Sequence, residues 1–595
     1  MHTEKKKRRL SRPVEKPGPS TSKEAPQDAN GDYADHDFFR GHFFHLLDDR
    51  DIVALRADAR STALQPLMFD TLSDVSFDRK LVDLPNFGSE SLPYKQNLLT
   101  NFGALDELQT DLARILAPYC DLYYPNATAA DGDRIRDLYC MHALNHILRT
   151  RQTVLAHNAK LKDMADAEPG KPVIPPESCR DQGLTRPKVL ILVPFRDRAL
   201  KCVNTMIKLL FGSGGEDDAQ RQFVTNRKRF KSEFQPDPDE KDSKRTDLPS
   251  DYKQIFTGNV DDCFRLGIGI ARKSLKLFVD FYQADIIIAS PLGLRAIIGA
   301  EGESEYEYDF LSSIEVLVMD ETDVFTMQNW SHVLHIVDHL HKTPKQSHGA
   351  DFSRVHMWVL NEWSQFYRQT LLFSSVASPE LRALFTRFCR NYAGCVSVKP
   401  RIAPNGVLDH ISISIPQCFH RVPCDNPAMQ ADKRFDYFVS KILPKYHDDN
   451  SMAHTLLFVA SYFDFVRIRN HFKRNAVSSV QCCEYTTNKK ISRARAMFFH
   501  GEKLMLMMTE RFHFYRRYKI RGAHHVIFYD LPLYPKFYAE VCNLTALSTQ
   551  EQPGIVITCT ALFTKYDAMK LAAVLGEKQA AKLIGSNKQI HAIVN

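Results

Sequence analysis

Apolar residues recur with two different spacings along the chain, and the change of spacing separates its predicted parts. From Gln96 to Lys160 they recur every three or four residues, as in LDELQTDLARILAPYCDLYY and RIRDLYCMHALNHILRTRQTVLAHNAKL, which is typical of helices that bury one face. The stretch FFRGHFFHLL, residues 38–47, has the same character. We therefore expect a helical extension over residues 37–186.

After Pro187 short apolar runs alternate with helical stretches. Helices are expected near residues 199–210 and 270–282, among others. The runs are KVLILV (188–193), DIIIAS (285–290), VLVMD (316–320) and TLLFSS (370–375). Near-continuous apolar strands that alternate with helices are typical of a parallel sheet covered on both faces. The pattern therefore predicts a first lobe over residues 187–420, in which the polar stretch 212–250 is a charged insertion.

The same alternation begins again in the last third of the chain. Its apolar runs are TLLFVA (455–460), CCEYT (482–486), KLMLMMT (503–509), HHVIFYD (524–530) and GIVITCTA (554–561). A second lobe is therefore expected over residues 421–595. Two successive units of this kind predict an α/β fold with two RecA-like parallel-sheet lobes in tandem, facing each other across a cleft.

Three acidic residues follow the third apolar run of the first lobe, in the sequence IEVLVMDETDVFTMQNW. They are Asp320, Glu321 and Asp323. Carboxylates at the end of a buried strand hold Mg²⁺ in enzymes that hydrolyse nucleotides. The sequence therefore raises the question of whether this chain still hydrolyses a nucleotide.

Composition narrows the class of protein. The chain has 595 residues, of which 44% are hydrophobic and 25% charged, and this is ordinary for globular domains. No apolar run approaches the roughly 18 residues that cross a bilayer, and no apolar stretch follows the basic N-terminus. We therefore expect neither a membrane span nor a secretory signal. The thirteen cysteines form no CxxC pair, which favours a reducing compartment.

The net charge is +7, and its distribution is more informative than its size. Residues 1–36 are rich in Pro, Ser, Lys and Glu and hold too little apolar surface to fold, so we expect a disordered basic tail. The tail contains a compact cluster of Lys5, Lys6, Lys7, Arg8 and Arg9. Such a cluster serves nuclear import or nucleic-acid contact, or it is simply a solvated chain end.

His142 and His146 lie four residues apart on a predicted helix, a spacing that can hold a metal ion. No third ligand is evident in the sequence. We therefore expect two partly buried structural histidines, and we predict neither a metal nor another cofactor.

The order of short motifs resembles that of a DEAD-box helicase. LILVPFRDRAL is similar to the first RNA-contacting segment and DIIIASPLGLR to the second. VLVMDETD is similar to the strand that holds magnesium, and LLFSSVASPELRALF to the segment that couples the lobes. TLLFVASYFDFVRIRNHF and TERFHFYRRYKIRGAHHVIFYDLP are similar to pieces of the second lobe. Six motifs in this order are a more specific signal than any one of them.

From about Asp37 onward the chain also resembles the digestive organ expansion factor (U3 small-nucleolar-RNA-associated protein twenty-five) family. The matching stretches include RDQGLTRPKVLILVPFR, ASPLGLRAIIG, MQNWSHVLHI, SQFYRQTLLFSS and FYDLPLYPKFYAEVCN. The resemblance implies a degenerate helicase without evident ATPase activity, acting in the nucleolus of the cell nucleus. It implies a role in the small-subunit processome, where pre-ribosomal RNA is processed toward 18S ribosomal RNA and the 40S subunit. The implied partners are pre-ribosomal RNA, the U3 small nucleolar ribonucleoprotein and other processome proteins, with no membrane.

The sequence departs from an active helicase at three places. The phosphate-cradling G-x-x-x-x-G-K-[ST] does not occur, and the nearest stretches, at Gly170 and Gly212, have a proline or acids in place of the required residues. Where a helicase has an arginine run in its second lobe, this chain has AEVCNLTAL, and the coupling Ser-Ala-Thr is Ser374-Ser375-Val376. Loss of an arginine finger alone lowers the rate by about 10³–10⁵. We therefore predict that the chain is not an enzyme.

Without catalysis, Asp320 and Glu321 are expected to cap the following helix and to bond nearby backbone amides, since carboxylates favour helix N-termini. Two alternatives stay open. One is an active RNA-dependent ATPase or helicase whose nucleotide loop has diverged. The other is a protein scaffold that never touches RNA.

Basic and aromatic residues alternate in the stretch TERFHFYRRYKIRG. Its basic residues are Arg511, Arg516, Arg517, Lys519 and Arg521, and its aromatic ones are Phe512, Phe514, Tyr515 and Tyr518. Arginine can bond phosphates while aromatic faces stack on bases. From the residues alone, a solvated face with an aromatic underside is the simpler interpretation. The helicase resemblance instead favours RNA or ribonucleoprotein contact, and it places three further arginines on the same cleft rim: Arg196, Arg198 and Arg295.

Overall fold

The computed structural model describes residues 37–57, 65–78, 81, 92–169, 172–212, 223–236, 248–303, 306–447, 452–551 and 554–594. Residues Phe38–Asn595 form one compact unit. The predicted tail over residues 1–36, with its cluster from Lys5 to Arg9, lies outside the described residues. In the part of the chain that is described, no helix combines the length and the apolar character needed to cross a membrane.

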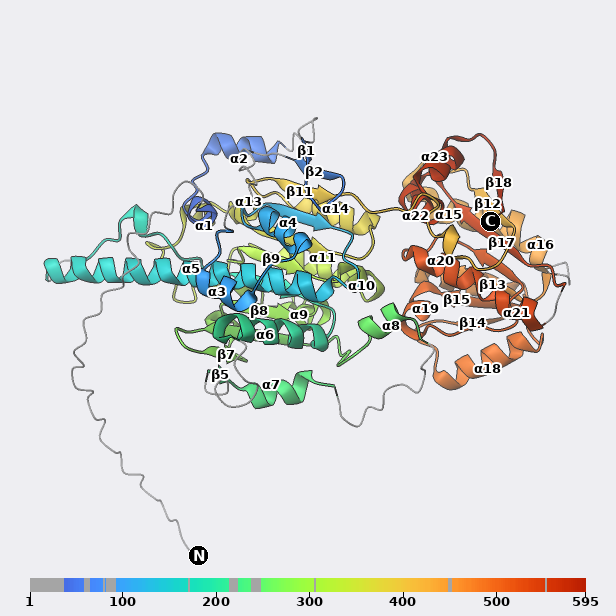
Figure 1. Ribbon diagram of the computed structural model, residues 1–595, viewed down its shortest axis with the longest axis horizontal. Coiled ribbons are helices and arrows are strands. Elements are labelled where there is room, and N and C mark those ends of the chain that lie inside the picture. Colours follow the sequence, from blue (N-terminus) through green and yellow to red (C-terminus); the bar gives the residue numbers. More distant parts are fainter. Residues whose placement is uncertain are drawn as a thin grey trace, which may run out of the picture. The chain divides into compact units, whose positions relative to one another are not determined.

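The first lobe is built on a sheet of eleven described strands (Figure 1). Their order is β1-β2-β11-β3-β10-β9-β4-β8-β6-β7-β5, and the six strands from β11 to β8 run parallel. The strands are β1 (Gln65–Leu67), β2 (Val75–Asp78), β3 (Asp121–Tyr124), β4 (Val189–Leu192), β5 (Val224–Thr225), β6 (Arg265–Ile270), β7 (Leu275–Leu277), β8 (Ile286–Ala289), β9 (Val316–Met319), β10 (Gln369–Phe373) and β11 (Cys395–Val398). The central strands are almost entirely apolar because both faces of the sheet are buried.

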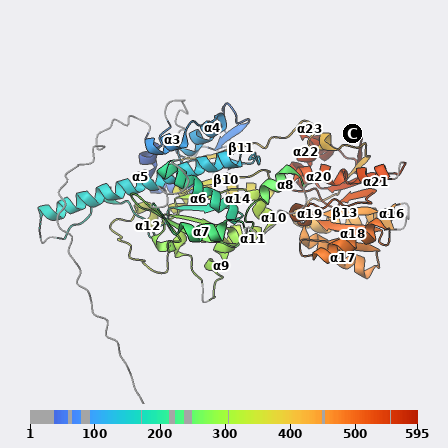
Figure 2. The ribbon, with the colours of Figure 1, turned by 60° about the horizontal axis from the view of Figure 1, so that its bottom comes forward.

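Helices α3 to α6 pack on one face of this sheet, and α9, α11 and α14 pack on the other. The buried part of α5 ends at Thr150, and the rest of this helix extends beyond the lobe (Figure 1 and Figure 2). The helices are α1 (Phe38–Phe43), α2 (Asp49–Arg56), α3 (Gln96–Phe102), α4 (Glu107–Leu116), α5 (Gly132–Ala167), α6 (Arg196–Phe211), α7 (Arg227–Phe234), α8 (Ser250–Ile255), α9 (Pro291–Ile298), α10 (Thr322–Met327), α11 (Trp330–His339), α12 (Met357–Leu360), α13 (Ser364–Tyr367) and α14 (Pro379–Phe388).

The second lobe has seven described strands in the order β14-β15-β13-β16-β17-β12-β18, all parallel except β18. They are β12 (Gln417–Arg421), β13 (Thr455–Val459), β14 (Ser479–Cys482), β15 (Met505–Thr509), β16 (His525–Phe528), β17 (Thr558–Phe563) and β18 (Ile590–Ile593). Helices α18, α19, α20 and α22 cover one face, and α16 and α17 cover the other. The helices are α15 (Gln430–Tyr437), α16 (Leu443–His447), α17 (Tyr462–Arg474), α18 (Asn488–Phe499), α19 (Glu510–Arg516), α20 (Pro535–Cys542), α21 (Thr545–Glu551), α22 (Ala568–Leu575) and α23 (Glu577–Gly585).

The predicted α/β fold with two lobes built on parallel-dominated sheets is confirmed. Three local expectations differ from the structure. Residues 37–186 contribute strands β1, β2 and β3 to the first sheet as well as helices. The helix expected near 270–282 is instead the end of β6, the strand β7 and a short 3₁₀ turn. β12 pairs with β17 in the second sheet, so the chain enters that sheet before residue 421. The division into domains as a whole stays a prediction.

The predicted charged insertion over residues 212–250 contains a folded part. Within it, α7 buries Phe230 and Phe234 in the core of the first lobe. Residues 213–222 and 237–247 lie outside the described residues.

His142 and His146 are both buried and hydrogen-bonded. Nε2 of His142 lies 2.7 Å from the side-chain oxygen of Gln369, and Nε2 of His146 lies 3.0 Å from a carboxylate oxygen of Glu315. Among the described residues, no group of three or more His, Cys, Asp or Glu side chains is arranged to hold a metal ion. The two histidines therefore connect α5 to the first sheet.

Candidate functional site

The three acids of the MDETD sequence lie at the carboxyl edge of the first sheet. β9 ends at Met319, directly before Asp320 and Glu321, and the neighbouring strand β10 ends at Phe373. β3 pairs with the other side of β10 and ends at Tyr124. Because these strands are parallel, the acids, the segment after β10 and the loop after β3 meet at one edge, where α/β sheets hold their ligands.

Two arginines neutralise the first two acids. Arg136 on α5 places Nη2 3.6 Å from Asp320 and 3.7 Å from Glu321. Arg198 on α6 donates from Nε to Glu321 at 2.5 Å, and the hydroxyl of Tyr139 donates to Asp320 at 2.9 Å. Arg136 is 2% exposed and Asp320 is 3% exposed, so these charges are paired away from water. The guanidinium groups supply the positive charge that a bound cation would supply to such carboxylates.

Burial and the arginines act on this cluster in opposite directions. Burial raises the pKa of Asp320 and of Glu321, while the charges of Arg136 and Arg198 lower the pKa of both. Burial lowers the pKa of Arg198, but the charge and hydrogen bond of Glu321 together with the charge of Asp197 raise it more, so the pKa of Arg198 stays above its ordinary value. Each charge in the cluster therefore depends on its partners.

The prediction that these acids cap the following helix is wrong for Glu321. This residue precedes α10 with a left-handed φ of 52°, and its side chain makes no capping hydrogen bond. Its carboxylate is held by Arg198 instead. Asp320 does bond a backbone amide, since it accepts the N–H of Glu321 at 2.9 Å. Tertiary ion pairs thus replace the local contact that the sequence suggested.

Asp323 connects the acid cluster to two other segments. It accepts hydrogen bonds from the backbone N–H and the hydroxyl of Ser375, at 3.0 and 2.7 Å. It also accepts the hydroxyl hydrogen of Tyr534, from the second lobe, at 2.8 Å. The third acid is therefore a structural link between the segment after β10 and the second lobe.

A loop of residues 125–131 joins β3 to α5 beside the acids. Its sequence, PNATAAD, contains neither glycine nor lysine. The N–H of Ala127 donates to the backbone oxygen of Ser374 at 2.8 Å, and Thr128 donates to Asp131 from both its N–H and its hydroxyl. Sequence reasoning missed this loop because DLYY continued a helical pattern. The turn-forming residues Pro125 and Asn126 after it were the available signal.

A cavity of about 500 Å³ opens at this edge of the sheet. The cavity is lined by both basic and acidic side chains. The basic ones are Arg136, Arg198, Lys201 and Lys536, and the acidic ones are Asp133, Asp251, Asp320, Glu321 and Asp323. Most of these groups are already paired with one another or with neighbouring side chains. The cavity is therefore nearly neutral and offers no concentrated charge to a phosphate chain.

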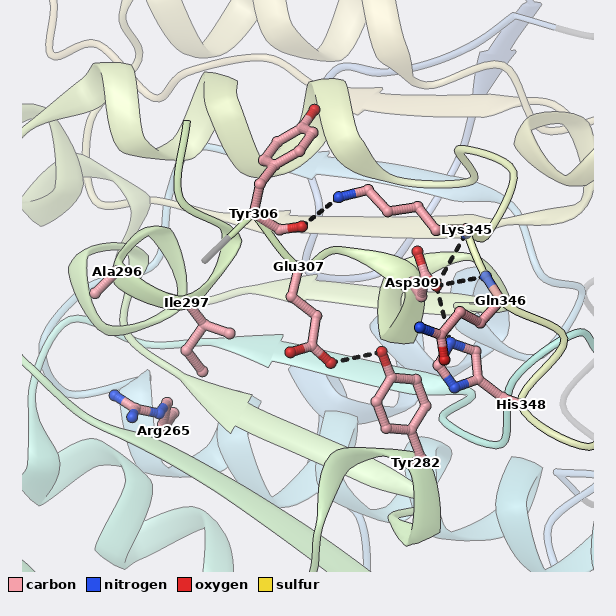
Figure 3. A pocket seen from close by; sticks show the side chains of 10 residues that line it. All are labelled: Arg265, Tyr282, Ala296, Ile297, Tyr306, Glu307, Asp309, Lys345, Gln346 and His348. Carbon is pink, nitrogen blue, oxygen red and sulfur yellow. Dashed lines mark hydrogen bonds and ion pairs between the residues drawn. The ribbon is translucent and has the colours of Figure 1, made fainter. Parts of the chain in front are cut away.

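A larger cavity of about 900 Å³ lies elsewhere on the first lobe (Figure 3). There the hydroxyl of Tyr282 donates to Glu307 at 2.7 Å, and Nε2 of His348 lies 2.8 Å from Asp309. None of the residues singled out by the sequence lines this cavity. Its size alone does not make it the functional site.

A buried apolar seam joins the two lobes next to the acid cluster. Phe195, Val324 and Met327 of the first lobe pack with Phe514, Leu533, Tyr534 and Phe537 of the second. The hydroxyl of Tyr515 donates to the backbone oxygen of Met327 at 3.2 Å. The seam resembles a small domain core, and its formation holds the lobes together through the hydrophobic effect.

Helix α8 forms a polar bridge beside this seam. Asp251 accepts a hydrogen bond from Arg517 at 2.9 Å and pairs with Lys536, and both partners belong to the second lobe. The hydroxyl of Tyr252 donates to the backbone oxygen of Tyr515 at 2.9 Å. At the other end of the helix, Arg198 donates to the backbone oxygen of Gln254 at 2.7 Å. α8 thus links the acid cluster to the second lobe.

Two of the arginines predicted to lie on an RNA-binding rim are buried. Arg198 is held by Glu321 and Asp197, and Arg517 is held by Glu540 and Asp251 with its guanidinium 4.4 Å from the ring centre of Phe537. Arg198 is enclosed by groups of the first lobe, and Arg517 lies in the contact between the lobes, so neither has the exposed position expected of a rim residue.

The other predicted arginines are more accessible but partly engaged. Arg196 pairs with Asp261 at 2.8 Å, Arg295 donates to the backbone oxygen of Gly299, and Arg511 lies 3.9 Å from Glu484. Arg516 is half-buried, whereas Lys519 and Arg521 are exposed. The structure therefore gathers Arg516, Lys519 and Arg521 at and just after the end of α19, and it leaves Arg196 and Arg295 on the first lobe. RNA contact by these residues stays a prediction.

Comparison with known proteins identifies the two lobes separately. Residues 119–396 match the family description "UTP25, NTP hydrolase-like domain", and residues 407–593 match "Utp25, C-terminal domain". Structural likeness to DEAD-box proteins is weak. The yeast splicing factor Prp28 is 13% identical with a TM-score of 0.28, covering 92% of this chain and 96% of that one. A DEAD box protein from Methanococcus jannaschii is 12% identical with a TM-score of 0.26, covering 83% of this chain and 95% of that one. The fold assignment therefore rests on the sheet topology of the chain itself.

Relatives in animals and fungi share one name. The chain is 47% identical to the "U3 small nucleolar RNA-associated protein 25 homolog" of Xenopus tropicalis and 46% identical to that of Homo sapiens, over 82% of its own length in both cases. It spans 62% and 63% of the length of these two relatives. It is 38% identical to the Schizosaccharomyces japonicus protein of that name, over 84% of this chain and 76% of the relative. The two matched domains and these identities show that the chain belongs to the U3 small nucleolar RNA-associated protein 25 family.

Proposed function

We propose that the chain is a non-catalytic, helicase-like binding factor of the nucleolar small-subunit processome, needed for processing of pre-ribosomal RNA toward 18S ribosomal RNA and the 40S subunit. The name shared by the relatives supports association with the U3 small nucleolar RNA. The observation that carries the non-catalytic part is the pairing of Asp320 and Glu321 with Arg136 and Arg198. The partners on this proposal are pre-ribosomal RNA, the U3 ribonucleoprotein and other processome proteins.

The loop after β3 supports the absence of ATP hydrolysis. In nucleotide-hydrolysing lobes a glycine-rich loop between a central strand and its helix turns free backbone N–H groups and a lysine toward the phosphates. Here residues 125–131 hold that place in the fold without glycine or lysine, and the N–H groups of Ala127 and Thr128 are already bonded. Several charge-assisted hydrogen bonds of roughly 1.5–3 kcal/mol each would be missing for a bound triphosphate.

The contact between the lobes favours a fixed binding surface and argues against a motor whose lobes open and close. Helicase-like motors work by closing and opening two lobes around their ligands, which requires an interface that separates readily. In this chain the seam buries four aromatic side chains: Phe195, Phe514, Tyr534 and Phe537. Polar bonds from α8 reinforce it. We infer that the lobes stay associated and present one binding surface.

The cellular role is tested by co-purification. The full chain, tagged and expressed in cells depleted of their own copy, is expected to sediment with particles that contain U3 RNA and the precursor of 18S ribosomal RNA. A test variant carries Arg517→Met and Lys536→Met, which remove the two cations that hold Asp251 of α8. This variant is expected to lose the association. If the parent chain sediments alone while 18S maturation proceeds normally, the processome role is contradicted.

A further inference from the structure

A basic face lies on the outside of the second lobe, away from the acid cluster. Between residues 466 and 521 the sequence has fourteen Lys and Arg but only three Asp and Glu. Eight of the fourteen lie on α18 or in the segment 516–521. α18 packs beside β14 and β15 at one edge of the second sheet (Figure 1). Such a concentration of one sign of charge is the electrostatic footprint of a polyanion site.

The basic residues of α18 share its outward side. Ile491, Ala494 and Phe498 form the buried side of the helix. The opposite side carries an exposed line of Lys489, Arg493 and His500, with Lys490 next to it. Steps of four and then seven residues keep the members of this line on one side of a helix. At 1.5 Å per residue this line is about 16 Å long, enough for several nucleotides of a strand.

These cations are not already neutralised within the lobe. Among the residues that the structure describes, none of Lys489, Lys490 and Arg493 has an ion-pair partner. This distinguishes them from Arg196, Arg198 and Arg517, which are bonded to acids of the chain itself. Counterions at unpaired surface cations are released when phosphates bind, and this release drives nucleic-acid association.

The α18 line is continuous with the segment that follows α19. Nη2 of Arg495 donates to the backbone oxygen of Lys519 at 3.0 Å, and its guanidinium lies 4.9 Å from the ring centre of Tyr518. Lys519 and Arg521 are exposed beside this contact. The basic surface therefore extends from Lys489 across α18 to Arg521.

Two exposed aromatic side chains flank the line. Tyr485, just before α18, is 70% exposed, and Phe499, at its last turn, is 41% exposed. A single exposed ring needs no explanation, but here two of them lie at the two ends of a line of cations that have no ion-pair partner in the described part of the lobe. A basic track with aromatic platforms fits a single nucleic-acid strand, in which cations bond the phosphates and unpaired bases stack on the rings.

We propose that the α18 face, defined by Lys489, Lys490, Arg493, Tyr485 and Phe499, binds an unpaired segment of RNA. The inference rests on the proposed function for the choice of RNA over DNA. It adds a contact surface on α18, whose residues do not line the cavity beside the acid cluster. An acidic protein surface would also meet the cations but would gain little from the two exposed rings.

The test is RNA binding by the full chain across a salt series, with an unstructured oligouridine of roughly 20 nucleotides as the probe. The α18 variant carries Lys489→Gln, Lys490→Gln and Arg493→Gln. The charge-matched control carries Lys578→Gln, Lys582→Gln and Lys588→Gln, all exposed on another part of the same lobe. A third variant, Arg511→Gln with Arg516→Gln and Arg521→Gln, probes the segment predicted from the sequence.

The α18 variant is expected to flatten the log-log salt slope by about 2, since each lost contact with a single strand contributes about 0.7. Between about 50 and 200 mM salt, the parent should then lose roughly 20-fold more affinity than the variant does. The control should bind like the parent. Tyr485→Ala with Phe499→Ala should weaken binding of the single strand at least about fivefold and leave a duplex of the same length unaffected.

The outcomes separate the two proposals. If the α18 variant binds like the parent while the Arg511 variant is weakened, the α18 inference is overturned and RNA contact by the other segment stands. If both charge variants bind like the parent, or if the parent binds no RNA, both RNA contacts are overturned, and an acidic protein becomes the partner class to test. If the duplex binds more tightly and the aromatic variant is unchanged, the claim of an unpaired strand fails.

Discussion

Replacement of Arg136 by methionine is expected to lower the free energy of unfolding by about 3–5 kcal/mol, the range seen when one partner of a buried ion pair is removed. Arg136 contacts both Asp320 and Glu321 and is almost fully buried. Without it, two carboxylates stay in a dry site with Arg198 as their remaining cation. Denaturant unfolding of the parent and the variant measures the effect.

The pH dependence of this loss has a defined sign. Burial already raises the pKa of Asp320 and Glu321, and removal of Arg136 raises it further. A carboxyl whose pKa is higher in the folded state stabilises the fold below its unfolded pKa, and that contribution disappears as the pH rises through the folded value. The deficit of the variant should therefore be larger at pH 8 than at pH 5.

A neighbouring arginine provides the control for this experiment. Arg134 lies on the same helix but is 45% exposed, and its partners Asp106 and Asp131 are at the surface or close to it. Arg134→Met should change stability by about 1 kcal/mol or less. The combination of Arg136→Met with Asp320→Asn should recover part of the loss. Equal effects of the two single substitutions would show that the acid cluster does not depend on Arg136.

Truncation of Phe537 to alanine is expected to destabilise the chain by about 3–5 kcal/mol and to loosen the lobe contact. Phe537 is completely buried in the seam, with ring centres of Tyr534 and His513 within about 5 Å and the guanidinium of Arg517 at 4.4 Å. Its loss leaves a cavity against residues of both lobes. Hydrogen exchange in α8 and α10 should accelerate, because both helices rest on the seam.

Phe463→Ala is the matched control, since this phenylalanine of the same lobe is 87% exposed. Surface substitutions of this kind usually stay within about 0.5 kcal/mol. Thermal melting and hydrogen exchange of both variants show whether Phe537 holds the two lobes together. If the Phe537 variant melts at the same temperature as the parent and keeps its exchange protection in α8, the lobes are held by contacts other than the apolar seam.

The buried parallel strands were predictable because their own residues encode them. VLIL, IIIA and VLVM in the first lobe, and TLLFV and MLMMT in the second, are almost continuously apolar, as strands covered on both faces must be. β3 was not predictable in this way. It is four residues long and begins with Asp121, whose burial is made tolerable by the N–H groups of Thr370 and Asn391, far along the chain.

The acids of the candidate site were predictable, but their partners were not. Asp320 and Glu321 stand out in the sequence, whereas Arg136 lies on a helix that the sequence assigned to a separate extension. Similarly, Arg517 belongs to a stretch with the composition of an RNA-binding surface. Only the positions of Asp251 and Glu540 in the folded chain show that it is an internal ion-pair residue. Pairing of charges across long sequence separations is a property of packing, and no local pattern records it.

ATP turnover by the full chain, measured with and without RNA, tests the central claim most directly. The parent is expected to show no turnover above background at physiological ATP and no stimulation by RNA. The reasons are that Arg136 and Arg198 hold the acids, and that the loop over residues 125–131 contains neither glycine nor lysine and already bonds the N–H groups of Ala127 and Thr128. Asp320→Ala and Glu321→Ala should then leave the background unchanged. RNA-stimulated turnover in the parent that either substitution abolishes would contradict the account.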